Sequence, residues 1–228
     1  PFDTDWHTPR ALSEDEIHAL IGHFVKSAHR AERAGFDFIE IHAAHGYLLH
    51  QFISPLSNHR KDQWGGSLEN RVRLAVEIVK AVKNAVPKMM VGARISVTDW
   101  VDGGLTVDEG VKVAQALEQA GAAYICCSSG GNSPLQQIPT GPGYQVHLAE
   151  AVKRAVSIPV RAVGMIDDAR QAEEIIAGGR ADIVALARAI LCDPRWPWRA
   201  AATLGEEIRS APQLARSTSL MKKWVGAS

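Results

Sequence analysis

The fold is indicated most clearly by residues 36–47, which read Phe-Asp-Phe-Ile-Glu-Ile-His-Ala-Ala-His-Gly-Tyr. The first six are mostly apolar and follow Gly35, a residue typical of helix ends, so they predict a buried strand. His42, His45 and Tyr47 come directly after this strand. In a barrel of parallel strands, catalytic groups gather at the carboxyl ends of the strands. We therefore expect these three side chains to contribute to an active site.

The two histidines and the tyrosine suit the activation of a conjugated carbonyl or nitro group. Imidazoles three residues apart can direct two N–H donors at one oxygen, and the phenol of Tyr47 can give up a proton. A purely structural role for a histidine near a strand end is one alternative, and half of a metal site is another. Zinc sites need three or four ligands, and no Cys or carboxylate lies at a suitable spacing nearby. We therefore predict no metal.

The composition is that of an ordinary globular protein, with 228 residues, 46% of them hydrophobic and 22% charged. The 25 basic and 25 acidic side chains cancel, so there is no basic excess that would indicate nucleic-acid binding. No apolar stretch approaches the length of a membrane span. Three cysteines, of which Cys126 and Cys127 are adjacent, fit reduced thiols better than disulfides. We expect a cytoplasmic protein without nucleic-acid or membrane partners.

Short apolar strands alternate with helices along the chain. Capping boxes begin helices at Ser13 and Thr106, and Asp167 is expected to cap a third helix over residues 168–178. Strands are expected at residues 36–42, 89–97, 123–128, 159–163 and 181–187. This alternation is typical of βα units with a parallel sheet. A doubly wound sheet would alternate in the same way, but no Gly-x-Gly-x-x-Gly motif opens a helix after a strand.

The last two units favour a (β/α)8 TIM barrel. Gly164 and Ala187-Arg188 each follow a strand and precede a helix, as do the phosphate-binding loops after strands seven and eight of such barrels. Gly164 could instead serve only a tight turn, and Arg188 could be solvated. We predict that this chain contains only about strands four to eight of the barrel.

The incomplete strand count has a consequence for partners. The remaining three strands would need roughly 90 further residues, and the first residue is Pro rather than Met. An open parallel sheet of five strands would expose two edges and part of its core. We expect a complementary N-terminal chain, or a second copy, to complete the barrel. Residues 1–216 would form the partial barrel and residues 217–228 a C-terminal tail.

Six segments together carry a family resemblance: residues 35–58, 65–73, 94–96, 128–130, 162–164 and 179–188. Their order, their spacing and the combination of His-x-x-His-Gly-Tyr with Gly-Gly-Ser-x-Glu-Asn-Arg resemble the Old Yellow Enzyme family of FMN-dependent ene-reductases. The similarity is greatest to the thermophilic-like branch and extends from about residue 1 to residue 216. The first third of that family has no counterpart in this sequence.

The resemblance implies a flavoprotein oxidoreductase that uses NADPH or NADH and reduces the activated C=C bond of an enone or nitroalkene. His42 and His45 match the pair that binds the activating oxygen of the substrate, and Tyr47 matches the proton donor. Arg94 matches the cation beside the flavin. The phosphate loop corresponds to Gly164, Ala187 and Arg188, although the family usually has Gly where Ala187 stands.

The resemblance also implies a homo-oligomer. Arg216 resembles an arginine that reaches the site of a neighbouring subunit, although the family normally has Tyr where Leu214 stands. From the residues alone, Arg94 could instead form a buried ion pair with Asp99 or Glu40. Two other functions stay open: a non-redox barrel enzyme that binds a phosphorylated substrate, and a non-catalytic half-barrel that assembles with another chain.

Overall fold

The computed structural model describes residues 3 and 5–225 and contains one parallel five-stranded sheet. The strands lie side by side in chain order: β1 (Phe38–Ala43), β2 (Met90–Ser96), β3 (Ile125–Ser128), β4 (Val160–Val163) and β5 (Ile183–Ala185). All four neighbouring pairs are parallel. The prediction of a parallel α/β sheet is therefore confirmed, and its strand order is that of consecutive units of a barrel.

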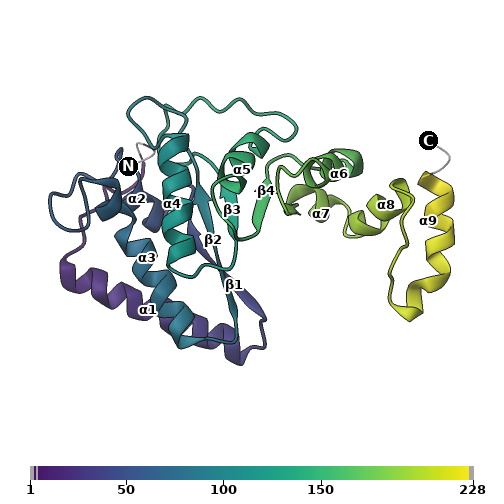
Figure 1. Cartoon of the computed structure of the whole chain (residues 1–228), viewed down its shortest axis with the longest axis horizontal. Helices are drawn as coiled ribbons and strands as arrows, with labels where there is room; N and C mark the ends of the chain where they lie inside the picture. The colour runs from purple at the N-terminus through teal and green to yellow at the C-terminus, as the bar shows by residue number, and fades with distance from the viewer. Residues whose placement is uncertain (1–2, 4, 226–228) are drawn as a thin grey trace.

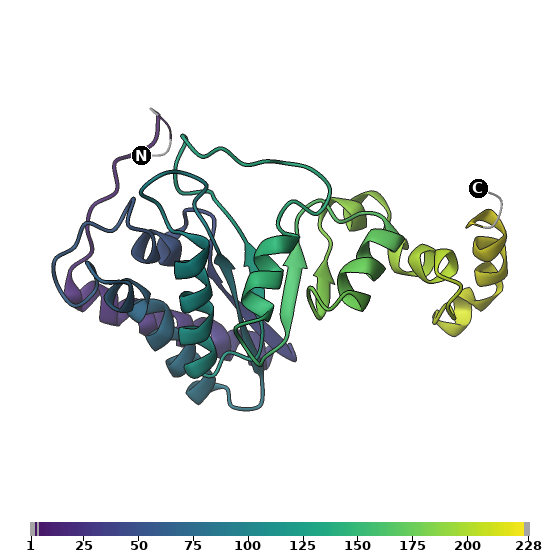
Figure 2. The ribbon, with the colours of Figure 1, turned by 45° about the horizontal axis from the view of Figure 1, so that its top comes forward.

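Helices alternate with the strands along the chain, and several of them cover one face of the sheet. They are α1 (Glu14–Arg33), α2 (Leu48–Ile53), α3 (Leu68–Ala85), α4 (Val107–Gln119), α5 (Val146–Lys153), α6 (Ala169–Ala177), α7 (Arg188–Cys192), α8 (Trp196–Thr203), the 3-10 helix η1 (Pro212–Ser217) and α9 (Thr218–Val225). Figure 1 shows α3, α4 and α5 in front of the strands. In Figure 2, α8 and α9 extend away from the sheet as an arm. The C-terminal segment that we expected as a tail thus contains a helix.

Side-chain caps set where several helices begin. The predicted capping boxes at Ser13 and Thr106 are both present. The prediction that Asp167 caps the helix after β4 is wrong, because Asp168 does so by accepting a bond from the Gln171 amide. The carbonyl of Asp167 instead accepts a bond of 2.5 Å from the indole of Trp196. The helix therefore begins one residue later than expected, and α8 is tied to this corner of the sheet.

The hydrophobic core lies between the sheet and its helices. Ile41, Val91 and Ile95 point into it, as does Leu117 from α4, and all four are buried. Because side chains alternate between the two faces of a strand, Phe38, Glu40 and His42 of β1 point to the opposite face, as do Met90, Gly92, Arg94 and Ser96 of β2. We call that face the inner face. It carries His42 and Arg94 near the carboxyl ends of β1 and β2, and none of the helices in the described part of the chain buries its Phe38 and Met90.

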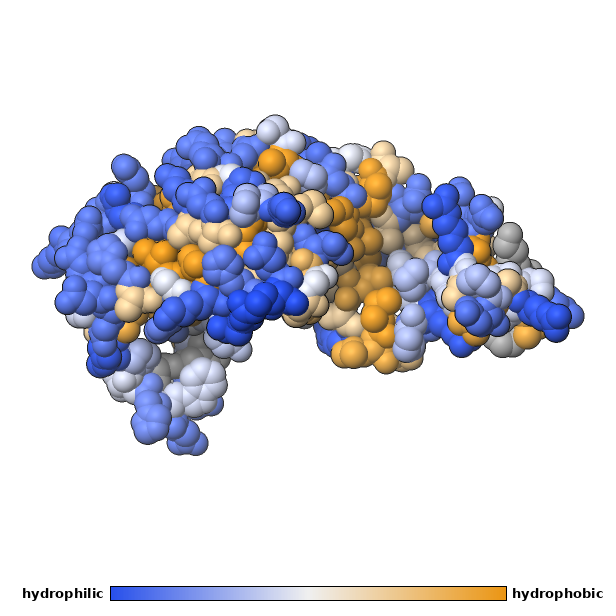
Figure 3. Space-filling view, turned by 90° about the horizontal axis from the view of Figure 1, so that it is seen from below, coloured by the Kyte–Doolittle hydropathy of each residue, from blue (hydrophilic) through white to orange (hydrophobic). Residues whose placement is uncertain are grey.

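The inner face leaves large apolar side chains in contact with solvent. Phe38 is 52% exposed, Met90 is 55% exposed and Ile183 is 43% exposed. Phe38 and Met90 are register partners, and Ile183 is the partner of Arg161 on the same face. Figure 3 shows hydrophobic residues gathered in the middle of the molecule, where its outline is hollowed. In a closed barrel these inward-facing positions would be filled by packed side chains.

The cysteines and the helix lengths bear on two further expectations. Cys126, Cys127 and Cys192 are all free, which agrees with the prediction of reduced thiols. Among residues 3 and 5–225, none of the helices combines the length and apolar character needed to cross a membrane.

Candidate active site

The structure brings His42, His45 and Tyr47 together at the carboxyl end of β1. His42 is the penultimate residue of the strand, His45 lies in the turn that follows, and Tyr47 immediately precedes α2. The ring centroid of His42 lies 5.2 Å from that of His45 and 5.4 Å from that of Tyr47. Tyr47 is 63% exposed. The three rings form an open cluster that a small molecule can approach from solvent.

Both histidines of the cluster favour the neutral state. Burial lowers the pKa of His45 to about 4, with a second contribution from the positive charge of Arg94. The pKa of His42 is also below its ordinary value, for the same two reasons in the same order. At neutral pH each ring therefore carries one N–H donor and one unprotonated nitrogen. Such rings can donate to an oxygen without adding a full positive charge to the site.

Arg94 stands next to the histidine cluster without a partner of its own. It is the register neighbour of His42, on β2. Its Nε atom is buried and has no hydrogen-bond partner among the described residues. The alternative of an ion pair is wrong, because Glu40 pairs with Arg161 and Asp99 lies against His50. A partly buried guanidinium without a counter-ion is suited to an anionic ligand.

A cavity of about 420 Å³ joins Arg94 to the predicted phosphate loops. Gly164, Ala187 and Arg188 line it together with Arg94 and His45. Gly164 has a φ of 123°, and a Cβ atom there would lie 2.7 Å from Nε2 of Gln145. Glycine is therefore required at this position, and it leaves the backbone open to the cavity. The structure thus places the two loops that we predicted to bind phosphate around one cavity.

A second cavity, of about 760 Å³, lies on the other side of the turn. His45 and Tyr47 line it with Phe52, Leu56 and residues 131–132. His45 belongs to both cavities, so it separates the space near Arg94 from the space near the phenol. This arrangement allows two ligands to meet at the imidazole cluster.

Sequence reasoning missed the role of Gln145 in the wall of the first cavity. Gln145 is only 2% exposed, and it accepts a bond of 2.5 Å from Ser129 and donates one of 2.9 Å to the carbonyl of Val163. The neighbouring Ser128 hydroxyl lies 2.6 Å from Nε2 of His45. Ser128 and Ser129 could have been identified from the sequence, because they lie at the carboxyl end of β3, where site residues of a barrel gather. Gln145 follows an irregular loop, and no pattern in the sequence marked it.

One predicted site residue lies apart from the others. Arg216 is in η1, which belongs to the C-terminal arm, and it lines neither cavity. Within the described residues, no three His, Cys, Asp or Glu side chains are grouped so that they could hold a metal ion.

Comparison with known proteins supports the assignment of the chain. Residues 3–207 match the NADH:flavin oxidoreductase / NADH oxidase family. An NADPH dehydrogenase of Geobacillus sp. (strain WCH70) is 44% identical over 216 residues, which cover 95% of this chain and 63% of that protein. An NADPH dehydrogenase of Bacillus subtilis (strain 168) is 42% identical over 215 residues, with 94% and 63% covered. The chain therefore spans a little under two thirds of the length of these relatives.

Solved structures resemble the fold as well. A 2-naphthoyl-CoA reductase complex superposes with a TM-score of 0.79 at 31% identity, covering 86% of this chain and 30% of the other. Morphinone reductase in complex with tetrahydroNAD gives a TM-score of 0.70 at 32% identity, with 91% and 54% covered. FMN and NAD(P)H are the cofactors of the family to which these findings point. The chain belongs to the NADH:flavin oxidoreductase / NADH oxidase family, and the resemblance to Old Yellow Enzyme-type proteins is confirmed.

Proposed function

We propose that this chain forms the flavin- and substrate-binding part of an NAD(P)H oxidoreductase that reduces the activated C=C bond of enones or nitroalkenes. The observation that carries the proposal is the cluster of His42, His45 and Tyr47 beside the unpaired Arg94. The names of the relatives, NADPH dehydrogenase and morphinone reductase, support the reaction class. Membership of a flavin family argues against the alternative of a non-redox phosphate-binding enzyme.

The cavity that contains Arg94 fits FMN in its donor chemistry. Arg94 would bind the anionic edge of the flavin ring, because its buried Nε has no hydrogen-bond partner within residues 3 and 5–225. The backbone at Gly164 and Ala187, with the guanidinium of Arg188, would hold the phosphate. When bound, FMN supplies to the β carbon of the alkene the hydride that NAD(P)H provides.

The protein's own residues would bind the substrate oxygen and deliver the proton. The Ser128 hydroxyl can donate to Nε2 of His45, which leaves the proton of a neutral ring on Nδ1 for the substrate. His42 would give the second N–H. Two such donors stabilise the negative charge that develops on the carbonyl or nitro oxygen. Tyr47 would then transfer its phenolic proton to the α carbon and regain one from solvent.

The Tyr47→Phe variant tests this proposal. We expect oxidation of the reduced enzyme by an enone to slow by roughly 10²–10⁴-fold, the usual contribution of a placed general acid. Reduction of the enzyme by NADPH should stay unchanged, because that step needs no proton from Tyr47. Stopped-flow absorbance measures both steps separately.

Tyr124→Phe is the matched control, since Tyr124 lines neither of the two cavities at the histidine cluster. Equal slowing of both steps in Tyr47→Phe would argue against the acid role. A wild-type protein that binds flavin but never reduces an enone would argue against the substrate class.

The uncovered inner face supports the need for further strands. We propose that complementary barrel strands, from a segment outside this sequence, pack on Phe38, Met90 and Ile183 and complete the flavin site in a cytoplasmic oligomer. Arg216 would then reach the site of a neighbouring subunit. Solution mass with and without the complementary segment tests this. A stable homodimer with the inner face protected would show that a second copy serves instead, and failure to bind flavin in any assembly would favour a non-catalytic half-barrel.

A further inference from the structure

The turn that carries His45 has an unfavourable backbone conformation. His45 has a φ of 61°, and the next residue, Gly46, has a φ of 73°. The left-handed region is unfavourable for a residue with a Cβ atom, because the Cβ atom comes too close to the following carbonyl oxygen. Such a conformation persists only where the surrounding structure holds it.

Three side chains bind the backbone of the turn. The amide of His45 donates to Oγ of Ser96 over 3.0 Å. The amide of Gly46 donates to Nδ1 of His50 over 2.9 Å, and the carbonyl of Gly46 accepts a bond of 2.7 Å from Gln51. The turn is therefore held by specific partners rather than by packing alone.

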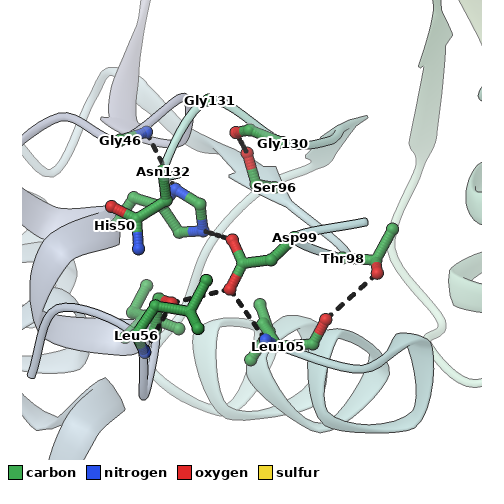
Figure 4. A network of polar contacts seen from close by, with 12 residues as sticks. Gly46, His50, Leu56, Ser96, Thr98, Asp99, Leu105, Gly130, Gly131 and Asn132 are labelled. Carbon is green, nitrogen blue, oxygen red and sulfur yellow. Dashed lines mark hydrogen bonds and ion pairs between the residues drawn. The ribbon is translucent and has the colours of Figure 1, made fainter. Parts of the chain in front are cut away.

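His50 is completely buried and lies against a buried carboxylate, Asp99 (Figure 4). Nε2 of His50 is 3.2 Å from Oδ1 of Asp99, and the side chains of both residues have no exposed surface. Neither atom has another partner among the described residues. The other carboxylate oxygen, Oδ2, accepts bonds of 2.6 Å from Ser54 and 2.7 Å from the Leu105 amide. The carboxylate is thus fixed from one side and faces His50 from the other.

These contacts specify where His50 carries its proton. Nδ1 accepts a bond from Gly46, so it cannot hold a proton itself, and the proton of the neutral ring must be on Nε2. A carboxylate at Nε2 favours this tautomer, because it can only accept. Burial raises the pKa of Asp99, but the bonds from His50, Ser54 and Leu105 outweigh it and hold this pKa below its ordinary value. Asp99 therefore stays an acceptor at neutral pH.

We propose that His50 and Asp99 are a positioning pair that acts through the Gly46 amide to hold His45 and Tyr47 in place for substrate binding and proton transfer. Neither member of the pair lines either of the two cavities described above. Asp99 sets the tautomer of His50, His50 holds the turn, and the turn aims the imidazole and the phenol. The inference deepens the proposed function and rests on it.

The tautomer can be measured directly in 15N-labelled protein with FMN bound. We expect the nitrogen chemical shifts of His50 to show a bare Nδ1 and a protonated Nε2, and the Gly46 amide to be protected from solvent exchange. In Asp99→Asn, an amide N–H can face Nε2 and favour the other tautomer, which meets the Gly46 amide with a donor. We expect Gly46 exchange to become at least roughly tenfold faster in that variant, which corresponds to about 1.4 kcal/mol.

A pair of substitutions at His50 separates positioning from stability. In His50→Asn, Oδ1 can replace Nδ1 as the acceptor for Gly46, whereas His50→Leu removes the acceptor at a similar volume. We expect Asn to preserve Gly46 protection and the rate of enone reduction within roughly threefold, and Leu to lose at least tenfold in both. Leu117→Ala, on the buried side of α4, is the control for lost stability without a change in the turn.

The outcomes distinguish the two proposals. A His50 ring protonated at Nδ1 in the wild type would overturn the inference. An Asp99→Asn variant would also overturn it if its Gly46 amide stayed protected from exchange and it reduced the enone as fast as the Leu117→Ala control. If the His50 tautomer and the protection of the Gly46 amide are as expected but the wild type reduces no enone, the proposed function is wrong. The conclusion that His50 and Asp99 fix the conformation of the turn then still holds. The wild-type measurement needs no variant, so it decides the tautomer even if a variant does not fold.

Discussion

The close approach of two loops at the active-site turn gives a quantitative prediction for Gly131→Ala. Gly131 has a φ of 94°, and a Cβ atom there would lie 2.4 Å from Cα and 2.5 Å from the carbonyl carbon of His45. These are backbone atoms, so no rotamer change can relieve the contact. The loop that carries Gly131 would have to move away from the turn, or the turn would have to change its conformation.

Gly66→Ala is the matched control for backbone conformation. Gly66 has a φ of 81°, and nothing lies within 4 Å of a Cβ atom built there. Placing alanine in the left-handed region costs about 1–2 kcal/mol, while the loss of freedom in the unfolded chain returns about 0.4–1 kcal/mol. We therefore expect Gly66→Ala to lower the free energy of unfolding by about 1 kcal/mol. Gly131→Ala carries the same cost plus about 1–3 kcal/mol for overpacking, so we expect about 2–4 kcal/mol.

Urea denaturation of the two variants measures this difference, provided that the slope of unfolding free energy against urea is the same in both. Gly131→Ala should also impair enone reduction, since the displaced loop contacts His45, whereas Gly66→Ala should not. Equal destabilisation by the two substitutions would refute the reasoning, because it would show that the contact between the loops is easily relieved.

Three further predictions concern charge, pH and packing. Arg94→Met should leave the unfolding free energy of the flavin-free protein within about 1 kcal/mol of wild type, because Arg94 loses no ion pair to another described residue. The same variant should bind FMN at least roughly tenfold more weakly in a flavin-fluorescence titration. An unchanged affinity for FMN would remove Arg94 from the site. Because the pKa of His45 is lowered to about 4, the unfolded chain binds this proton more tightly than the folded protein does. The contribution of His45 to stability should therefore be full above about pH 6.5 and decline as the pH falls towards 4. In thermal melts at several pH values, His45→Gln should reduce the slope of stability against pH. An unaltered slope in that variant would assign the effect to other groups, His42 first among them. Leu117→Ala should lower the unfolding free energy by about 2–5 kcal/mol through loss of a completely buried side chain, and a change below about 1 kcal/mol would mean that the site collapses without a cavity.

Local signals in the sequence were sufficient for the elements and their ends. The caps at Ser13 and Thr106 were predicted from two residues each, because a capping box depends on bonds within one turn of helix. Asp167 and Asp168 could not be separated in this way, since either can cap. In the structure Asp168 is the cap, while the carbonyl of Asp167 accepts a bond from Trp196, a residue from a distant part of the chain.

The sequence by itself determined the parallel sheet, the strand end that carries His42 and the loops at Gly164 and Arg188, because strand length, apolar pattern and turn residues are properties of neighbouring positions. Only the tertiary structure decided the partners of buried polar groups. Asp99 could have neutralised Arg94 on sequence grounds, yet it faces His50 and leaves Arg94 unpaired. The reason is physical: a buried charge takes the partner that the packing of the sheet and helices brings within hydrogen-bond distance, and no local pattern encodes that distance.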